Sequence, residues 1–146
     1  MNKAFVFIDG SNFYFKLKEL SGMLEGKFSL KMYADQQKLI AKLQKQDVMV
    51  TLGHMIQHPD KTFHEKGVDV RLAVEMIRFA REDKYDVAYL LSSDTDIVAA
   101  VEEVQSLGKQ VCYVGIAKGQ SFGLTKAAND SRLLKAEDIQ PFLASV

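Results

Sequence analysis

The sequence predicts a three-layer α/β/α fold around a mostly parallel central sheet. Short, continuous apolar runs such as Ala4–Ile8 and Val87–Leu91 are typical of strands that are buried on both faces. The segments between these runs carry apolar residues three or four positions apart, the spacing of helices that pack one face on a core. Strands that alternate with helices need crossover connections, and these connections give a parallel sheet.

In the N-terminal half, the sequence pattern predicts some helices and strands more strongly than others. A first helix is expected from Asn12 onward and a second around residues 39–43, where apolar residues recur at helical spacing. Val48–Leu52 has the composition of the next strand. His54–Lys66 is polar and contains a proline, so we expect a surface loop there. Between the two helices only residues 28–33 leave room for a strand, and we expect a stunted strand or a sheet with fewer members.

The C-terminal half has clearer helix boundaries. A long helix is expected from Asp69, with an apolar face and a charged stripe opposite. Asp94 or Thr95 can cap the next helix, because Asp and Thr side chains accept hydrogen bonds from the first free backbone N–H groups. Gly108 is placed to end that helix, and Val111–Val114 is the following strand.

Composition indicates one globular domain over residues 1–146. The chain is 47% hydrophobic and 26% charged, which is ordinary for a globular protein. No apolar run approaches the roughly 20 residues that cross a bilayer, and the first run is too short for a signal peptide. A single cysteine, Cys112, forms no internal disulfide, so we expect a buried thiol and a cytoplasmic location.

Charge is balanced overall but unevenly spread. Residues 82–103 contain seven acids and one lysine, whereas residues 109–135 contain five cations and one acid, a net of +4. The zero net charge argues against strong, indiscriminate binding of nucleic acid. An acidic pocket beside a basic segment suits a metal site that receives a polyanion, although scattered surface charge explains the same composition.

Four aspartates are the candidate chemical centre. Asp9 directly follows the first strand, and Asp94 and Asp96 follow the third. If these two strands are neighbours in the sheet, their carboxyl ends deliver three carboxylates to one edge. Asp69 joins them if its helix begins at that edge. Oxygen-only ligands suit Mg²⁺ or Mn²⁺, and such ions can polarise a phosphodiester and activate water.

Each aspartate also has a simpler structural explanation. Asp94 or Asp96 can be a helix cap, Asp9 before Gly10 can be a turn residue, and Asp69 can stabilise the positive end of its helix. The coincidence of strand-end positions favours the metal site.

Residues near these acids are candidates for binding substrate. Hydroxyl, amide and cationic side chains can contact phosphate oxygens, but caps and solvated surface residues have the same composition. These candidates are Ser11, Asn12, Lys66, Arg71, Ser93, Thr95 and Lys118. Phe122, in a glycine-containing segment after Lys118, can stack on a base or pack on its own loop. The three histidines lack a zinc spacing and are expected to be exposed.

Four segments resemble the NYN domain, a branch of the PIN-like nuclease superfamily that includes the LabA-like bacterial proteins: FIDGSNF at 7–13, EKGVDV at 65–70, LSSDTD at 91–96 and GKQV at 108–111. The resemblance implies a parallel sheet between helices and hydrolysis of RNA with one or two metal ions. It places the metal ligands at Asp9, Asp69, Asp94 and Asp96, with Asn12 nearby. The chain departs from the family in the short stretch between its first two helices.

These observations predict a Mg²⁺- or Mn²⁺-dependent ribonuclease acting on single-stranded RNA or a structured loop. The alternative is a non-catalytic RNA-binding or regulatory module, which retains the acidic metal site but does not cleave RNA. Clustered negative charge argues against that alternative, because a surface that only binds polyanions gains nothing from it. The partner expected in either case is RNA, and a homodimer is among the oligomeric states that the sequence leaves open.

Overall fold

The computed structural model describes residues 3–10, 37–38, 40–45, 49–52, 54–57, 59 and 63–139. The chain divides into two compact units, one formed by residues 1–23 with 69–146 and the other by residues 24–68. The larger unit contains the predicted acidic residues.

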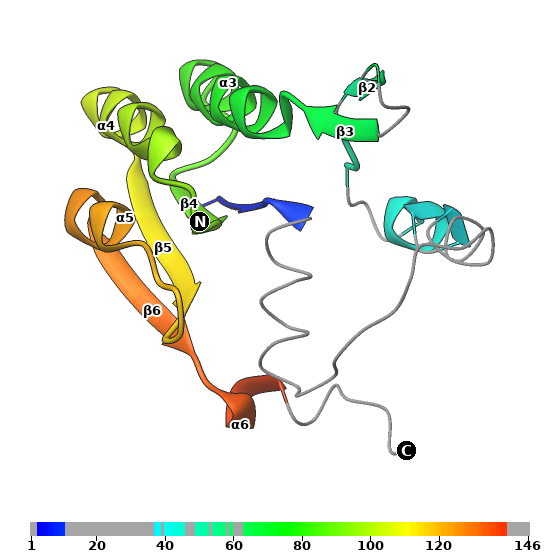
Figure 1. Cartoon of the computed structure of the whole chain (residues 1–146). Coiled ribbons are helices and arrows are strands. Elements are labelled where there is room, and N and C mark those ends of the chain that lie inside the picture. The colour runs from blue at the N-terminus through cyan, green and yellow to red at the C-terminus, as the bar shows by residue number, and fades with distance from the viewer. Residues whose placement is uncertain are drawn as a thin grey trace. The chain divides into compact units, whose positions relative to one another are not determined.

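A four-stranded parallel sheet forms the centre of the larger unit (Figure 1). Its strands are β1 (Ala4–Ile8), β4 (Val87–Leu91), β5 (Gln110–Ile116) and β6 (Asp130–Leu134), in the order β1-β4-β5-β6. Every neighbouring pair is parallel. The mostly parallel α/β sheet predicted from the sequence is therefore confirmed. β5 is longer than the predicted Val111–Val114, and β6 was not predicted.

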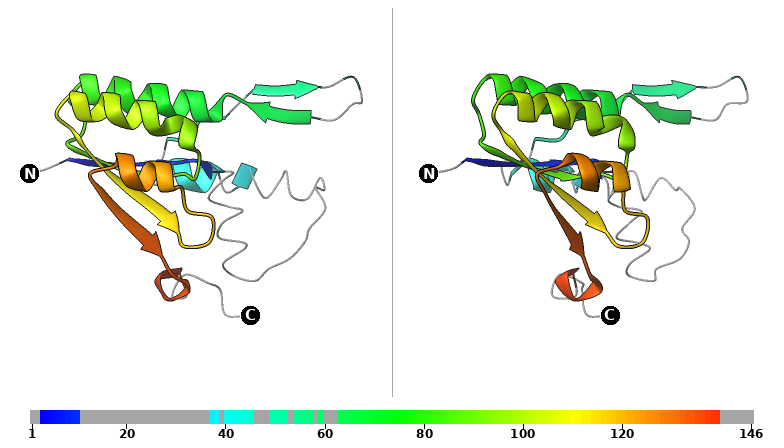
Figure 2. Two further views of the ribbon diagram at one scale, coloured as in Figure 1. Left: turned by 60° about the vertical axis from the view of Figure 1, so that its left-hand side comes forward. Right: turned by 90° about the vertical axis from the view of Figure 1, so that its left-hand side faces the viewer.

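The helical elements below lie in the described part of this unit. They are α3 (Val68–Arg81), the 3₁₀ turn η1 (Thr95–Ile97), α4 (Val98–Ser106), α5 (Phe122–Ala127) and α6 (Ala136–Ile139). Figure 2 shows α3 and α4 side by side on one face of the sheet, with α5 on the same side beside α4. The start of α3 agrees with the helix predicted from the acidic residue at position 69.

The hydrophobic core lies between the sheet and these three helices. Leu90 and Tyr113 come from the central strands, Met76 from α3 and Val101 from α4, and all four are fully buried. Apolar side chains at alternate strand positions face this core because successive residues of a strand point to opposite faces.

An aromatic cluster joins β1 to α3. The ring of Phe7 lies 5.5 Å from that of Tyr85 and 6.5 Å from that of Phe79, measured between ring centroids. Tyr85 is fully buried, and its hydroxyl donates a hydrogen bond of 2.8 Å to the carbonyl of Met76. Burial raises the pKa of Tyr85 to about 12, so the hydroxyl stays protonated and keeps donating.

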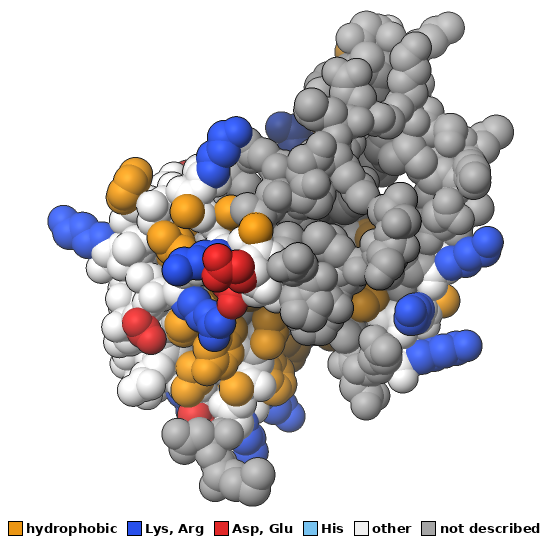
Figure 3. Space-filling view, turned by 90° about the horizontal axis from the view of Figure 1, so that it is seen from below, with side chains coloured by type: hydrophobic (Ala, Val, Ile, Leu, Met, Phe, Trp, Pro, Cys, Tyr) orange, Lys and Arg blue, Asp and Glu red, His pale blue; other side chains and the backbone are white. Residues whose placement is uncertain are grey.

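The opposite face of the sheet is apolar and partly exposed. Val6, Ile8 and Tyr89 are 59%, 44% and 39% exposed, and Figure 3, seen from below, shows hydrophobic side chains gathered on this side. In the described part of this unit, α3, α4 and α5 form a helical layer on the other face of the sheet. The first helix predicted from the sequence, after Asn12, lies outside the described residues.

The smaller unit corrects two sequence predictions. Residues 49–52 of the expected strand Val48–Leu52 have no regular structure. The expected loop at His54–Lys66 instead contains two antiparallel strands, β2 (His54–Gln57) and β3 (Phe63–Lys66). An antiparallel pair is held by backbone hydrogen bonds and can face water, so polar residues do not exclude it.

Other N-terminal predictions have a mixed outcome. Residues 40–44 are helical, as expected for the second helix, and the stunted strand expected at residues 28–33 lies outside the described residues.

Gly108 follows α4 with a φ of 77°, which confirms the predicted helix end. Among the described residues no helix has the length and apolar content needed to cross a membrane.

Candidate functional site

The carboxyl ends of β1 and β4 lie side by side, as the sequence predicted. The backbone N–H of Asp9 donates to the carbonyl of Leu91 at 3.0 Å, which extends the pairing of the two strands by one residue. Asp9 therefore leaves β1 next to the point where the chain leaves β4 toward Asp94. Both aspartates are half-buried.

A tight turn after β4 positions Asp94. The backbone N–H of Asp94 donates to Ser92 Oγ at 3.1 Å, and the Asp94 carboxylate accepts the N–H of Asp96 at 2.9 Å. Asp94 is thus the N-cap of η1, so the capping explanation is correct for this residue. A carboxylate has about four acceptor positions, and one cap leaves capacity for a cation. Ser92, only 5% exposed, organises this turn and was not singled out from the sequence.

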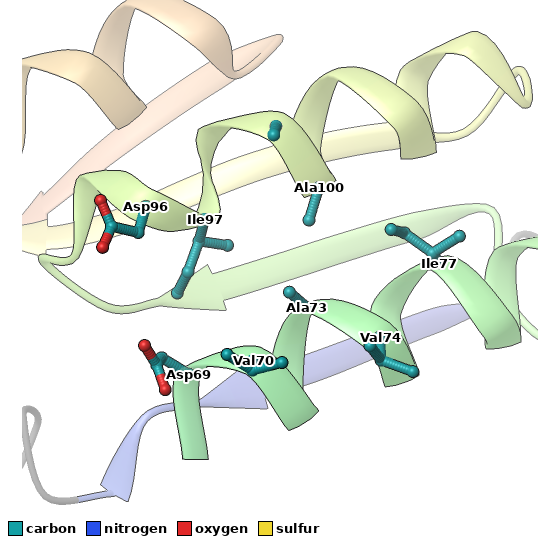
Figure 4. A pocket seen from close by; sticks show the side chains of 9 residues that line it. Asp69, Val70, Ala73, Val74, Ile77, Asp96, Ile97 and Ala100 are labelled. Atoms are coloured by element: carbon teal, nitrogen blue, oxygen red, sulfur yellow. The ribbon is translucent and has the colours of Figure 1, made fainter. Parts of the chain in front are cut away.

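Asp69 and Asp96 line one end of a groove of about 290 Å³ between α3 and the η1–α4 segment. Figure 4 shows both carboxylates at the end of the groove toward which β1 and β4 run, each on the first turn of its helix. The remaining lining is aliphatic and consists of Val70, Ala73, Val74, Ile77, Ile97, Ala99 and Ala100.

An ion pair joins α3 to α4 toward the C-terminal ends of the two helices. Arg81 Nη2 lies 3.1 Å from Glu103 Oε1, and both side chains are largely exposed. Such a pair adds little stability by itself. Its contribution is geometric, because it links the two helices whose first turns carry Asp69 and Asp96.

The structure brings the predicted acids to one edge of the sheet but does not close them into a tight cluster. Within the described ranges, no group of three or more His, Cys, Asp or Glu side chains is close enough to hold a metal ion. Mg²⁺ is commonly bound through one or two carboxylates, with water and substrate phosphate completing its octahedron. The oxygen-only donors Asp69 and Asp96, with Asp9 and Asp94 leaving the adjacent strand ends, fit that requirement.

The polar residues predicted to bind substrate fall into several groups. Ser93 and Thr95 lie in the turn that carries Asp94, where Ser93 is half-buried and Thr95 is exposed. Arg71 forms an ion pair of 3.5 Å with Glu75 on the same helix, in agreement with the solvated-face alternative.

The remaining predicted residues are Lys118, Lys66, Ser11 and Asn12. Lys118 is exposed in the turn between β5 and α5. Lys66 is exposed at the end of β3 in the smaller unit. Ser11 and Asn12 lie outside the described residues.

Ion pairs reduce the positive charge that residues 109–135 can offer to a polyanion. Lys109 pairs with Asp83 and, at 3.6 Å, with Asp86, and its hydrogen bond to Asp83 raises the pKa of the lysine. Arg132 pairs with Asp138 at 3.2 Å. Two of the five cations counted in this segment are thus locally neutralised, and the positive charge available to a polyanion is smaller than composition suggested.

Comparisons with known proteins agree with this architecture. The family model of the NYN domain matches residues 3–135. No curated protein sequence matches the chain. A solved structure of a protein of unknown function from Vibrio parahaemolyticus is similar in fold, with a TM-score of 0.71 and 20% sequence identity over 92% of this chain and 93% of that chain. The family match covers most of the chain, and we conclude that this protein belongs to the NYN domain family.

Proposed function

We propose that this chain is a metal-dependent ribonuclease that hydrolyses RNA phosphodiester bonds at the carboxyl edge of its parallel sheet. NYN domains belong to the PIN-like nuclease superfamily, whose members usually use divalent metal ions. The observation that supports the proposal is the convergence of Asp69 and Asp96 at one end of a groove, beside the strand ends that lead to Asp9 and Asp94.

The acids would act as ligands and would need a cation before RNA could approach. Two like charges 4 Å apart repel by about 1 kcal/mol in water and by about 4 kcal/mol near a protein surface. Phosphate brings further negative charge, so an acidic edge opposes RNA unless it is neutralised. When bound, Mg²⁺ or Mn²⁺ supplies Lewis-acid polarisation of the phosphodiester and activation of water. One of Asp9, Asp69, Asp94 and Asp96 can in addition accept a proton from the attacking water.

The residues around the acids would hold the RNA chain. Ser93 and Thr95 bring hydroxyl groups to the same turn as Asp94, and exposed Lys118 brings a positive charge after β5. Hydrogen bonds to ionised phosphate oxygens are stronger than neutral ones, so a few such donors can orient a scissile phosphate. Asn12, Ser11, Lys66 and Arg71 remain candidates for this role.

We also propose that residues 1–146 act as a single NYN domain in the cytoplasm. The family match begins in the larger unit, continues through residues 24–68 and returns to the larger unit, which supports one domain. Cys112, the sole cysteine, is half-buried and not fully buried as predicted, and burial raises the pKa of its thiol. A chain with one cysteine forms no internal disulfide and needs no oxidising compartment for one, which supports the cytoplasmic location.

The proposal is tested by incubating a labelled single-stranded RNA pool with the protein in Mn²⁺, Mg²⁺ or EDTA. Asp94→Asn, purified identically, controls for a contaminating nuclease. Glu102→Gln is a matched control, because Glu102 is an exposed acid on α4 away from the strand ends. We expect metal-dependent cleavage by the wild type and Glu102→Gln at similar rates, and cleavage by Asp94→Asn that is slower by roughly 100-fold. RNA binding without cleavage by any of the three would favour the non-catalytic module.

A further inference from the structure

We propose that Phe122 is a stacking platform for an unpaired nucleobase beside the acidic edge. This inference rests on the proposed function, and it adds a specificity-determining residue to it.

The exposure of Phe122 is the first observation. Its side chain is 77% exposed, the largest fraction among the exposed large hydrophobic residues of the described chain. This value contradicts the alternative in which Phe122 packs on its own loop. A single exposed hydrophobic residue is common on protein surfaces. The argument therefore depends on where this ring is held and how firmly.

Phe122 begins a helix that contacts the turn carrying two of the proposed metal ligands. α5 packs on η1, and a Cβ atom added to Gly123 would lie 3.1 Å from Thr95 Cγ2. Thr95 stands between Asp94 and Asp96 in the sequence. The missing side chain at Gly123 thus lets the first turn of α5 approach the acidic turn closely, and the preceding residue is Phe122.

The backbone on either side of Phe122 is firmly anchored. Ser121 is 4% exposed, its backbone N–H donates to the hydroxyl of Tyr113 at 3.0 Å, and its own hydroxyl accepts the N–H of Leu124 at 3.2 Å. Tyr113 and Leu124 are fully buried, and the hydroxyl of Tyr113 occupies the space that a side chain at Gly115 would need. Stacking of a base on a ring held by such a backbone costs little backbone conformational entropy.

The residues near Phe122 favour a nucleotide over an apolar protein partner. Lys126 lies four positions after Phe122 on α5, and side chains four residues apart share one face of a helix. Lys126 is exposed, and so is Lys118 in the preceding turn. A ring among cations fits a base and its phosphates. Duplex RNA keeps its bases stacked inside, so only an unpaired base can reach the ring.

The experiment measures binding of an unstructured RNA decamer that contains one 2-aminopurine, whose fluorescence is quenched by stacking. Every protein carries Asp94→Asn, so that cleavage is too slow to affect the binding measurement. Phe122→Ala removes the ring, Phe122→Leu keeps an apolar side chain without a π face, and Phe122→Trp keeps the aromatic platform. Val6→Ala is the matched control, because Val6 is an exposed apolar residue on β1.

We expect Phe122→Ala and Phe122→Leu to weaken binding of the decamer by roughly 5- to 150-fold and to lose the fluorescence change. Phe122→Trp should retain both, and Val6→Ala should match the parent. Equal affinity for Phe122→Ala and the parent would overturn the inference. It would equally be overturned by full binding of Phe122→Leu or by failure of the parent to bind the decamer.

Binding and cleavage separate the two proposals. Metal-dependent cleavage by the wild type together with unchanged RNA binding by Phe122→Ala would contradict the stacking role of Phe122 and support the nuclease proposal. Weaker RNA binding by Phe122→Ala without cleavage by the wild type would contradict the nuclease proposal and support the stacking role. Circular dichroism of each variant checks the fold, which substitution of an exposed side chain should not alter.

Discussion

Asp94 combines a structural and a proposed chemical role, and two substitutions separate them. Its carboxylate accepts the N–H of Asp96 at 2.9 Å at the start of η1. Asparagine retains an acceptor oxygen and caps helices as well as aspartate does, so Asp94→Asn should change the free energy of unfolding by at most a few tenths of a kcal/mol. Asp94→Ala has no acceptor and should lose about 1 kcal/mol.

The two variants should nevertheless lose activity alike. Neither carries the negative charge of Asp94, and a metal site supplies several kcal/mol of transition-state stabilisation. We expect single-turnover cleavage in Mg²⁺ to fall by roughly 100-fold in both, equivalent to about 3 kcal/mol. Urea unfolding followed by circular dichroism gives the stability of the same samples. Near wild-type cleavage by Asp94→Asn would refute the ligand role and leave Asp94 as a cap alone.

Three further predictions concern the fold that holds the site. Tyr85→Phe removes the buried hydroxyl that donates to the Met76 carbonyl and should lower the free energy of unfolding by about 1–2 kcal/mol in urea; an unchanged midpoint would contradict this. The backbone N–H of Lys3 donates to the Asp86 carboxylate and holds its pKa below the ordinary value of 3.8. The ionised carboxylate therefore stabilises the fold above pH 3.8, and this stabilisation is lost as the pH falls through the lowered pKa. The difference in melting temperature between wild type and Asp86→Asn should therefore be largest near neutral pH and shrink below pH 3.8; an equal difference at pH 2 would count against it. Gly108→Ala forces a side chain onto a φ of 77° and should cost about 1 kcal/mol in thermal unfolding, a cost that would be absent if the turn can relax.

The elements that the sequence predicted well carry a strong side-chain signal. β1 and β4 are continuous apolar runs whose bounds agree with the predicted strands. β6, in contrast, has the sequence DSRLL and begins with three exposed residues. It joins the sheet by pairing with β5, and backbone hydrogen bonds leave no mark on side-chain pattern. The β2–β3 pair was missed for the same reason.

The candidate site likewise contains features that the sequence predicted and features that it did not. The rule that parallel strands end at one edge predicted that Asp9 lies beside the exit of β4 if the two strands are neighbours, and the strand order of the structure meets that condition. The pairing of Asp69 with Asp96 along one groove depends on how α3 packs beside α4, which periodicity does not determine. The exposure of Phe122 likewise depends on distant contacts, because its neighbours are anchored on residues of β5 and η1.

The most direct test of the proposed metal site is a Mn²⁺ titration followed by electron paramagnetic resonance, which reports binding without turnover. Wild type, Asp69→Asn and Asp96→Asn are compared with Glu102→Gln, an exposed acid on α4. We expect the wild type and Glu102→Gln to bind Mn²⁺ alike, and each aspartate variant to bind at least about 10-fold more weakly. Absence of Mn²⁺ binding by the wild type, or equal affinity in all four proteins, would contradict a metal site at this edge of the sheet.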